Sequence, residues 1–412
     1  MQTSPKMNTI RKTVCFTFLF IVSFFLNSEA QWTMQSSGIS DGISDIFTSS
    51  SDSAYAVTAT FASGGKIIAT KNGSTWNQQY SSPDYLLTVF FRSSTLGWAG
   101  GGILPNGVVL KTTDGGVNWI PQATSVYQIY SIYFIDDTLG WAIGNDATQG
   151  RCYIYNSTNG GATWTQQFSG FDYLRHIYFT SPLVGYADGD NGRIFKTTDG
   201  GINWTLLTTG VVFHFNEVDF VTDSIGWAVG SYINGGCYYT GNGGNTWTAQ
   251  TLPITQPLTL SSVSFVSPDS GWISGENGTV LFTSNGGFTW TIQSTPVSND
   301  LSSISFSGKN NGYAAGAAGT IIRYENSSSA LGETGDRSYT IGPNPTHDVL
   351  FINSIAASTE VEFRITDNTG RLVLAGLLKP EKTAISVENL SPGLYYFEPN
   401  IKGQLPLRFI KY

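Results

Sequence analysis

Histidine and cysteine are scarce in this chain of 412 residues, which contains three of each. A zinc site needs three or four such ligands close together, so the three histidines exclude a dense one, and we expect no metal and no cofactor. Beyond residue 30 the only cysteines are Cys152 and Cys237. They fall in units of the repeat described below that are not neighbours, at a separation that exceeds disulfide reach. We therefore expect two buried free thiols, with a disulfide as the alternative.

Charged residues make up only 12% of the chain, and the 29 acidic residues outnumber the 21 basic ones. Lysine and arginine form no cluster along the sequence. An acidic surface without a basic patch repels phosphate backbones and anionic lipid. We expect no nucleic-acid partner.

Long apolar runs are also missing, apart from thirteen residues at positions 14–26 that follow three basic residues. This run is too short to span a bilayer but fits the core of a secretory signal peptide. Residues 28–30 suit a signal peptidase, so residues 1–30 are predicted to be a signal peptide that is removed before Gln31. An uncleaved anchor is the alternative. Removal takes away three basic residues and one acidic residue, which changes the formal charge from −8 to −10, and leaves no predicted transmembrane segment.

Glycine and tryptophan are abundant instead, with 47 and 11 residues, and much of this excess belongs to a repeat. An apolar strand recurs at intervals of 41 to 45 residues, with the pattern Val or Ile, any residue, then usually Phe. Its Val or Ile stands at Ile46, Val89, Ile132, Ile177, Val218, Val263 and Ile304.

Two further signals follow each such strand in fixed order. A glycine followed by an aromatic residue places that aromatic residue at Trp98, Trp141, Tyr186, Trp227, Trp272 and Tyr313, with Tyr55 as a counterpart without the glycine. A Gly-Gly turn of the form T/S-x-D/N-G-G-x-T/N-W then closes five units at Trp119, Trp164, Trp204, Trp247 and Trp290, and a shortened copy ends at Trp76. Asn-Gly pairs typical of β-hairpins lie between the two signals. Four short strands in each unit predict a propeller blade.

The last unit lacks a fourth strand, because residues 301–324 run into a serine-rich segment without a Gly-Gly turn. Residues 31–35 at the other end of the predicted mature chain contain Trp32 and repeat the W-x-x-Q that follows several turns. We therefore predict an all-β, seven-bladed β-propeller that is closed by its N-terminal strand, which leaves no open sheet edge. An open array of β units is the alternative, but it leaves Trp32 unexplained.

The complete unit resembles the repeat of the photosystem II stability and assembly factor family, and its turns resemble the Asp-box (BNR) repeats of sialidases. This resemblance covers residues 31–325 and implies the propeller fold. It does not imply an activity, because such propellers host unrelated ones. The chain also lacks the arginine-rich patch that a photosystem-binding role would suggest.

Residues 326–412 lack the Gly-Gly turns and the tryptophans of the repeat. Residues 326–337 are predicted to be a linker, and residues 338–412 contain six or seven short alternating strands that predict a small β-sandwich. Four ordered landmarks resemble the C-terminal sorting domain of the type IX secretion system, and they place its signal at Pro343, Asn344, Pro345, Gly370, Arg371, Gly393, Tyr395 and Lys411. The resemblance implies that the type IX machinery of a Gram-negative bacterium is a partner and that the protein is secreted or attached to the outer-membrane surface. An ordinary accessory sandwich is the alternative.

Catalysis is the less favoured function. A sialidase-like site needs three arginines around the channel, and only Arg175 is well placed; xyloglucanase-type enzymes pair two propellers, whereas this chain has one. His176 and Glu217 directly precede the Ile or Val of adjacent inner strands, and Asp219 lies two residues on. These three residues make a glycoside hydrolase or lyase the alternative function. Polar groups solvated by channel water would give the same pattern.

The loops that lead into each blade are rich in aromatic residues and are expected to surround the channel mouth on the face of the Asn-Gly hairpins. Exposed aromatic side chains with few charges suit stacking on sugar rings or contact with a protein. Several of them are expected to be buried between blades. The candidate ligand-binding residues are Tyr85, Tyr127, Phe171, Tyr173, Arg175 and His214. The sequence thus favours a non-catalytic binding or adhesion module for a glycan or a protein.

Overall fold

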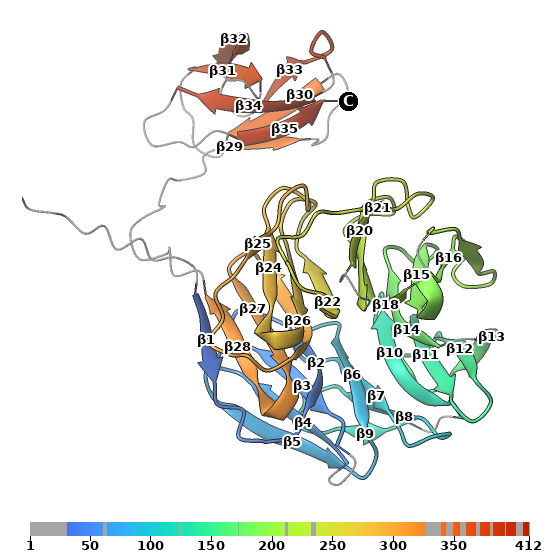
Figure 1. The fold of residues 1–412 in the computed structure, drawn as a ribbon. Helices are drawn as coiled ribbons and strands as arrows, with labels where there is room; N and C mark the ends of the chain where they lie inside the picture. The colour runs from blue at the N-terminus through green and yellow to red at the C-terminus, as the bar shows by residue number, and fades with distance from the viewer. Residues whose placement is uncertain are drawn as a thin grey trace, which may run out of the picture. The chain divides into compact units, whose positions relative to one another are not determined.

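The computed structural model describes residues 31–60, 64–122, 125–171, 173–210, 213–231, 236–325, 339–342, 349–354, 360–367, 371–379, 382–391, 393–400 and 407–411. The chain divides into two compact units between Ser327 and Ser328 (Figure 1). The described parts of both units are built from β-strands, and none of their helices is long and apolar enough to cross a membrane.

The first unit contains seven four-stranded antiparallel sheets arranged as blades around an axis (Figure 1). Blades 1 to 3 are β2 (Ile43–Thr48), β3 (Ala54–Thr58), β4 (Gly65–Thr70) and β5 (Trp76–Ser82); β6 (Leu86–Phe91), β7 (Gly97–Gly101), β8 (Val108–Thr112) and β9 (Ile120–Pro121); and β10 (Gln128–Phe134), β11 (Gly140–Asp146), β12 (Arg151–Ser157) and β13 (Thr165–Phe171). Blades 4 and 5 are β14 (Leu174–Phe179), β15 (Gly185–Gly189), β16 (Ile194–Thr197) and β17 (Thr205–Leu207); and β18 (His214–Phe220), β19 (Gly226–Ser231), β20 (Gly236–Thr240) and β21 (Thr248–Ala249). Blades 6 and 7 are β22 (Leu260–Phe265), β23 (Gly271–Gly275), β24 (Val280–Thr283) and β25 (Thr291–Ile292); and β26 (Leu301–Gly308), β27 (Asn311–Gly316), β28 (Ile321–Glu325) and β1 (Gln31–Gln35).

The N-terminal strand completes the last blade, as predicted. Strand β1 pairs antiparallel with β28, with Trp32 opposite Tyr324. The inner strands of blades 1 and 7 also contact each other, because the Thr48 N–H donates to Ser305 Oγ (2.9 Å) and Thr48 Oγ1 donates to the Ser305 carbonyl (2.7 Å). Blade 7 therefore joins the two ends of the propeller sequence. Its outer strand is the N-terminal β1, and its inner strand β26 contacts β2 of blade 1.

Aromatic side chains from adjacent blades form the same three-ring stack at six blade junctions. The aromatic residue of a second strand stacks on the inner-strand Phe of the next blade, with ring centroids 3.4–3.7 Å apart, in the pairs Tyr55–Phe91, Trp98–Phe134, Trp141–Phe179, Tyr186–Phe220, Trp227–Phe265 and Trp272–Phe306. The Trp that closes each blade then contacts this Phe edge-on at 5.8–6.0 Å. Trp32 contacts Phe306 in this geometry, at 5.9 Å and 87°, so it is the closing tryptophan of blade 7.

The Gly-Gly turns also join neighbouring blades. The aromatic residue of a second strand donates a hydrogen bond to the first glycine carbonyl of the next blade's turn, as from Trp98 Nε1 to Gly160 (3.0 Å) and from Trp141 Nε1 to Gly200 (3.2 Å). Blade 7 has no such turn, and the buried Trp272 Nε1 has no acceptor in the described structure. The Asp or Asn before the two glycines holds each turn, as where Asp114 Oδ1 accepts from the Asn118 N–H (2.9 Å) and Asn159 Oδ1 from the Thr163 N–H (2.9 Å). Hydrogen bonds from Asn118 lower the pKa of Asp114 to about 2.

Three short 3₁₀ segments connect the second and third strands of blades 4, 6 and 7, namely η1 (Asp190–Gly192), η2 (Glu276–Gly278) and η3 (Ala317–Gly319). Asn191 and Gly192 have φ values of 59° and 67°, the paired positive values expected of an Asn-Gly hairpin. Because the inner strands start where these hairpins lie, we call this end of the propeller its upper end.

Cys152 on β12 and Cys237 on β20 are buried and are not joined in a disulfide, which confirms the expectation of two buried thiols. Burial raises the pKa of the Cys237 thiol, because the thiolate is poorly solvated there.

The second unit is a two-sheet sandwich, as predicted. One sheet has the strand order β29 (Tyr339–Gly342), β30 (Val349–Ser354), β33 (Lys382–Ser386), and the other has the order β32 (Leu372–Leu378), β31 (Val361–Asp367), β34 (Gly393–Pro399), β35 (Leu407–Lys411). Buried side chains from both sheets, including Leu350, Ile365 and Phe397, form a single core.

The predicted sorting-signal residues that the structure describes have structural contacts in this sandwich. Arg371 Nε donates to Asp367 Oδ2 (3.0 Å), and the Tyr395 hydroxyl donates to the Ser391 carbonyl (2.7 Å). Lys411 is 7% exposed and lies opposite Gly393 in the pairing of β34 with β35. The remaining four, Pro343, Asn344, Pro345 and Gly370, lie outside the described residues.

Candidate functional site

The inner strands of all seven blades enclose a cavity of about 420 Å³. Each inner strand has a β-bulge at the same position, as between Leu174 and His176 and between Phe215 and Glu217. A bulge places one extra residue on a strand, so two consecutive side chains face the same side. The bulges explain why the residues at −2 and −1 from the Val or Ile of the repeat both line the cavity.

The lining side chains form three tiers. The upper tier is Ser44, Leu87, Tyr130, Arg175, Asn216, Ser261 and Ser302. The middle tier is Asp45, Thr88, Ser131, His176, Glu217 and Ser303, and Ser262 has the equivalent strand position in blade 6. The lower tier is Phe47, Phe90, Tyr133, Tyr178, Asp219, Ser264 and Ser305.

Middle-tier side chains connect adjacent blades. An inner strand is the edge of its sheet, so some of its backbone N–H groups lack a ladder partner. Side-chain oxygens of the preceding blade accept from them, as Asp45 Oδ2 does from Val89 (2.9 Å), Ser131 Oγ from Ile177 (3.2 Å) and Glu217 Oε2 from Val263 (3.2 Å). Asp219 in the lower tier accepts likewise from the Phe265 N–H (2.6 Å). The sequence located these positions but not this role, which depends on the register between blades.

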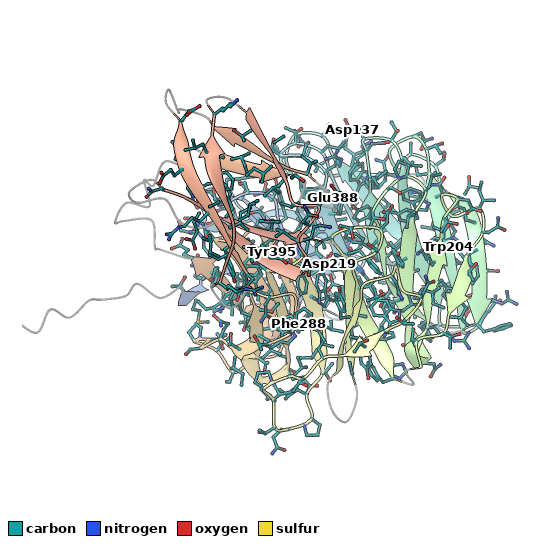
Figure 2. All side chains as sticks on the ribbon, turned by 90° about the horizontal axis from the view of Figure 1, so that it is seen from above. Asp137, Trp204, Asp219, Phe288, Glu388 and Tyr395 are labelled. Carbon is teal, nitrogen blue, oxygen red and sulfur yellow. The ribbon has the colours of Figure 1, made fainter. Side chains whose placement is uncertain are left out.

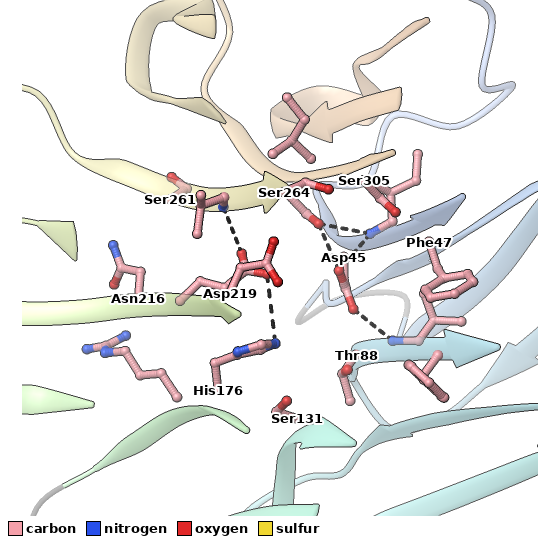
Figure 3. Close-up of a pocket in the computed structure, with 18 of the residues that line it drawn as sticks. Asp45, Phe47, Thr88, Ser131, His176, Asn216, Asp219, Ser261, Ser264 and Ser305 are labelled. Atoms are coloured by element: carbon pink, nitrogen blue, oxygen red, sulfur yellow. Dashed lines mark hydrogen bonds and ion pairs between the residues drawn. The ribbon is translucent and has the colours of Figure 1, made fainter. Parts of the chain in front are cut away.

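The three candidate catalytic residues do line one cavity (Figure 3). His176 Nε2 lies 3.8 Å from Glu217 Oε1, and burial lowers the pKa of His176 to about 4. Burial raises the pKa of Asp219 to about 7 and raises that of Glu217 well above its usual range, where the neighbouring carboxylates of Asp45 and Asp219 contribute. At neutral pH the imidazole is therefore uncharged.

Asp188 on β15 belongs to the same group and was missed by the sequence reasoning. It is fully buried behind His176, with its Oδ1 3.9 Å from His176 Nδ1, and neither carboxylate oxygen has a hydrogen bond in the described structure. Burial raises its pKa well above the usual range. Alignment of the second strands could have revealed it, because the equivalent residues in the other blades are Val57, Gly100, Ile143, Val229, Ser274 and Ala315.

Two of the predicted ligand-binding residues meet at the upper end. Arg175 Nη2 lies 2.8 Å from Asp190 Oδ1, and His214 Nδ1 lies 3.0 Å from the same oxygen. The side chains of Arg175 and His214 remain 39% and 46% exposed. We call these three residues the upper rim cluster; Tyr173 is half-buried near it.

Two other predicted residues belong to blade 3, where Tyr127 directly precedes the inner strand β10 and Phe171 ends the outer strand β13. Tyr127 stacks on Tyr153 with ring centroids 4.5 Å apart, and the Arg151 guanidinium lies over the Phe171 ring at 4.7 Å. Phe171 is 68% exposed. Tyr85 lies just before β6, where its carbonyl accepts from the Gly102 N–H (2.9 Å).

Other aromatic residues of the entry loops are structural. Phe213 and Phe215 are buried against Tyr238 and Trp247 in the core between blades 4 and 5. Among the residues that the structure describes, no group of three His, Cys, Asp or Glu side chains could hold a metal ion.

Comparisons with known proteins agree with the two-part architecture. Residues 203–295 and 244–325 match the family model of the photosynthesis system II assembly factor YCF48, and residues 340–405 match that of the secretion system C-terminal sorting domain. No curated protein matches the chain.

Solved structures with the same fold include YCF48 bound to D1 peptide, at 17% identity and a TM-score of 0.58, where the match covers 71% of this chain and 96% of that one. YCF48 from Cyanidioschyzon merolae matches at 19% identity and a TM-score of 0.57, with 72% and 99% covered. A GH74 xyloglucanase from Xanthomonas campestris matches at 10% identity and a TM-score of 0.56, with 79% of this chain but only 59% of the enzyme covered. The chain therefore combines a β-propeller like that of the photosystem II assembly factors with a C-terminal sorting domain of the type IX secretion system.

Proposed function

We propose that this protein is exported through the type IX secretion system and that its propeller binds a protein partner without catalysing a reaction. The tail supports export, since its sandwich and its sorting-domain match occupy the same residues. The propeller is the exported part that remains to act outside the cell.

One observation carries the preference for binding over catalysis. The candidate acids are engaged in joining blades, because Glu217 and Asp219 each accept a backbone N–H from β22. A general acid or base must offer its carboxyl group to a substrate. Both groups thus fill a structural role, which Ser131 and Ser264 fill at the equivalent positions of other blades.

The upper end is the proposed binding face. The upper rim cluster and Phe171 present exposed charge and an exposed ring there, which are the side-chain types that dominate protein interfaces. A protein ligand is favoured over a glycan because a similar structure is that of YCF48 bound to a peptide. Exposed aromatic rings suit sugars as well, so glycan retention is the competing outcome.

Selection of a displayed peptide library on the purified chain without residues 1–30 tests this function. Enriched peptides should bind the parent and the Phe288→Ala variant equally, because Phe288, labelled in Figure 2, is 85% exposed on a Gly-Gly turn at the other end of its blade. Arg175→Ala and Phe171→Ala should each weaken the same peptides by about tenfold. Retention on a polysaccharide panel without peptide enrichment would replace the protein partner by a glycan.

The second candidate function is a glycoside hydrolase or lyase, favoured by the shared cavity and the 3.8 Å separation of His176 and Glu217. Incubation with the same polysaccharide panel followed by product analysis tests it. Release of oligosaccharide that Glu217→Gln abolishes would overturn the binding function. The variant keeps an oxygen that can accept from Val263 N–H, so loss of activity would not reflect loss of the blade contact.

A further inference from the structure

The lower tier of the cavity is asymmetric in a way that the fold does not require. In blades 1 to 4 it carries Phe47, Phe90, Tyr133 and Tyr178, whose successive ring centroids are 5.4, 5.1 and 4.9 Å apart. We call these four residues the aromatic arc. In blades 5 to 7 the same position carries Asp219, Ser264 and Ser305. The cavity therefore has an aromatic wall on one side and a polar wall with a carboxyl group on the other.

The rings of the aromatic arc are half-buried and still line the cavity. They contact one another at tilted angles between 46° and 64°, so their faces and edges are staggered around the wall. The face of an aromatic ring is electron-rich and attracts a cation that approaches within about 6 Å of its centroid. The chain already uses this attraction within blade 1, where Lys71 Nζ lies 4.1 Å from the Tyr55 ring centroid.

The ionisable groups of the cavity are mostly acidic. Among its lining residues, three are acidic, namely Asp45, Glu217 and Asp219, and the one lysine or arginine is Arg175, which is paired with Asp190 above them. His176 is neutral at pH 7, and the buried Asp188 behind it adds a fourth carboxyl group without a hydrogen bond in the described structure. Arg92 follows the lower end of β6, and its Nε donates to the Ile135 carbonyl (3.2 Å). The site thus combines acidic groups with aromatic faces, and the one lysine or arginine among its described lining residues, Arg175, is already paired with Asp190.

We propose that the lower part of this cavity binds an organic cation, an ammonium or guanidinium group on an alkyl stem, between the aromatic arc and Asp219. The alkyl stem contacts the rings of Phe90 and Tyr133, and the charged head lies between the ring faces and the carboxylate. A cavity of about 420 Å³ is within the usual range for a small-ligand site. The proposed cation site uses the lower tier and none of the residues assigned to the protein-binding face, so the two proposals can be tested independently.

The titration of the cavity gives the proposal a pH signature. A bound cation favours the ionised form of Asp219, whose pKa of about 7 in the free protein means that it must release its proton first. Affinity should therefore rise as the pH increases from 5 to 8. The titratable groups that face Asp219 are Glu217 on its own strand, His176 and Tyr178 on β14, Tyr133 on β10 and Asp45 on β2. His176 is already neutral over this range, so it does not oppose the trend.

Ligand-observed NMR titration of the purified chain at pH 8 tests the proposal. The probes are pentylamine, propylguanidine and Nα-acetyl-lysinamide, with 1-pentanol and pentanoate as neutral and anionic counterparts of similar shape. We expect at least one cation to bind about tenfold or more tightly than 1-pentanol, and pentanoate not to bind. Tighter binding of pentylamine would indicate a small free amine as the ligand, and tighter binding of the lysine derivative would indicate a lysine side chain of a protein.

Three variants locate the binding. Asp219→Asn keeps an oxygen that can accept from Phe265 N–H but removes the charge, and Phe90→Leu keeps an apolar side chain but removes the ring, so each should weaken the cation by about tenfold. Asp199→Asn is the matched control, because it removes an acidic charge from an exposed Gly-Gly turn where other blades carry Asn159, Asn242 and Asn285. It should leave affinity unchanged. Equal binding of pentylamine and 1-pentanol, an effect of Asp199→Asn equal to that of Asp219→Asn, or affinity that falls as the pH rises would each overturn the proposal.

Discussion

Tryptophan-to-phenylalanine substitution should cost less at Trp272 than at Trp141. Both indoles are buried and stack on the Phe of the next blade, at 3.7 and 3.4 Å. They differ in the indole N–H, because Trp141 donates to the Gly200 carbonyl (3.2 Å), whereas Trp272 faces blade 7, which lacks the Gly-Gly turn, and has no acceptor in the described structure. The pair therefore separates the hydrogen bond from the packing.

The expected difference follows from the hydrogen-bond balance. Trp141→Phe loses a net contribution of about 1 kcal/mol, and the Gly200 carbonyl keeps a second donor in Gln167 Nε2 (3.2 Å). Trp272→Phe removes a buried donor whose unmet hydrogen bond costs about 1–3 kcal/mol. The loss of ring volume is common to both. Trp141→Phe should thus be more destabilising by about 2–4 kcal/mol.

Urea unfolding followed by tryptophan fluorescence measures this difference for the propeller alone, because all 11 tryptophans lie before residue 326. With a slope of about 3 kcal/mol per molar urea, 2 kcal/mol shifts the midpoint by about 0.7 M. Trp227→Phe is the control, since Trp227 donates to the Gly286 carbonyl (3.2 Å) and should behave like Trp141. An equal loss at Trp272 and at the two hydrogen-bonded tryptophans would refute the reasoning.

Three further outcomes are expected. Trp32→Ala should destabilise the propeller by about 3–5 kcal/mol in the same urea assay, because it removes a closing ring that is 2% exposed. Asp219→Asn should be more stable than the parent, by a margin that grows from pH 4 to about pH 7 and then levels off. The reason is that burial raises the pKa of Asp219 to about 7 in the folded state, so the free energy of unfolding of the parent falls by up to about 1.4 kcal/mol per pH unit in this window. Urea midpoints of both proteins across the pH range measure the difference. Deletion of residues 338–412 should leave the propeller inside the cell envelope, as surface proteolysis and fractionation would show; normal display without them would remove the sorting role.

The blades could be predicted from the sequence because their signals are local. A Gly-Gly turn needs backbone angles that favour glycine, as at Gly115 (φ 73°) and Gly116 (φ 88°), and each turn precedes a tryptophan with a fixed place in the stack. The same reasoning identified Trp32 as the closing tryptophan of blade 7, because the strand that this blade lacks is present at the N-terminal end of the propeller sequence. Local chemistry repeated at a constant interval is enough to define architecture of this kind.

The site was less predictable because its contacts depend on the register of paired strands and on the packing of neighbouring blades. Sequence reasoning found His176 and Glu217 but not Asp188, whose position opposite His176 depends on the register of β14 with β15. It expected some aromatic rings of the entry loops to be exposed and others to be buried between blades but could not tell them apart, and the structure buries Phe215 in the core between blades 4 and 5. Neither the bulges nor the hydrogen bonds between inner strands can be recognised from the sequence of a single repeat.

The asymmetry of the cavity distinguishes architecture from function. All seven inner strands meet the same structural demand, because each presents edge N–H groups to its neighbour. Serine meets it at Ser131, Ser262 and Ser303 without burying a charge. Asp219 meets it as well, but burial raises the pKa of its carboxyl group to about 7. Since the adjacent serine at Ser264 satisfies the Phe306 N–H in the same geometry (3.2 Å), the fold does not explain the choice of an acidic residue opposite the aromatic arc. A ligand that supplies positive charge does.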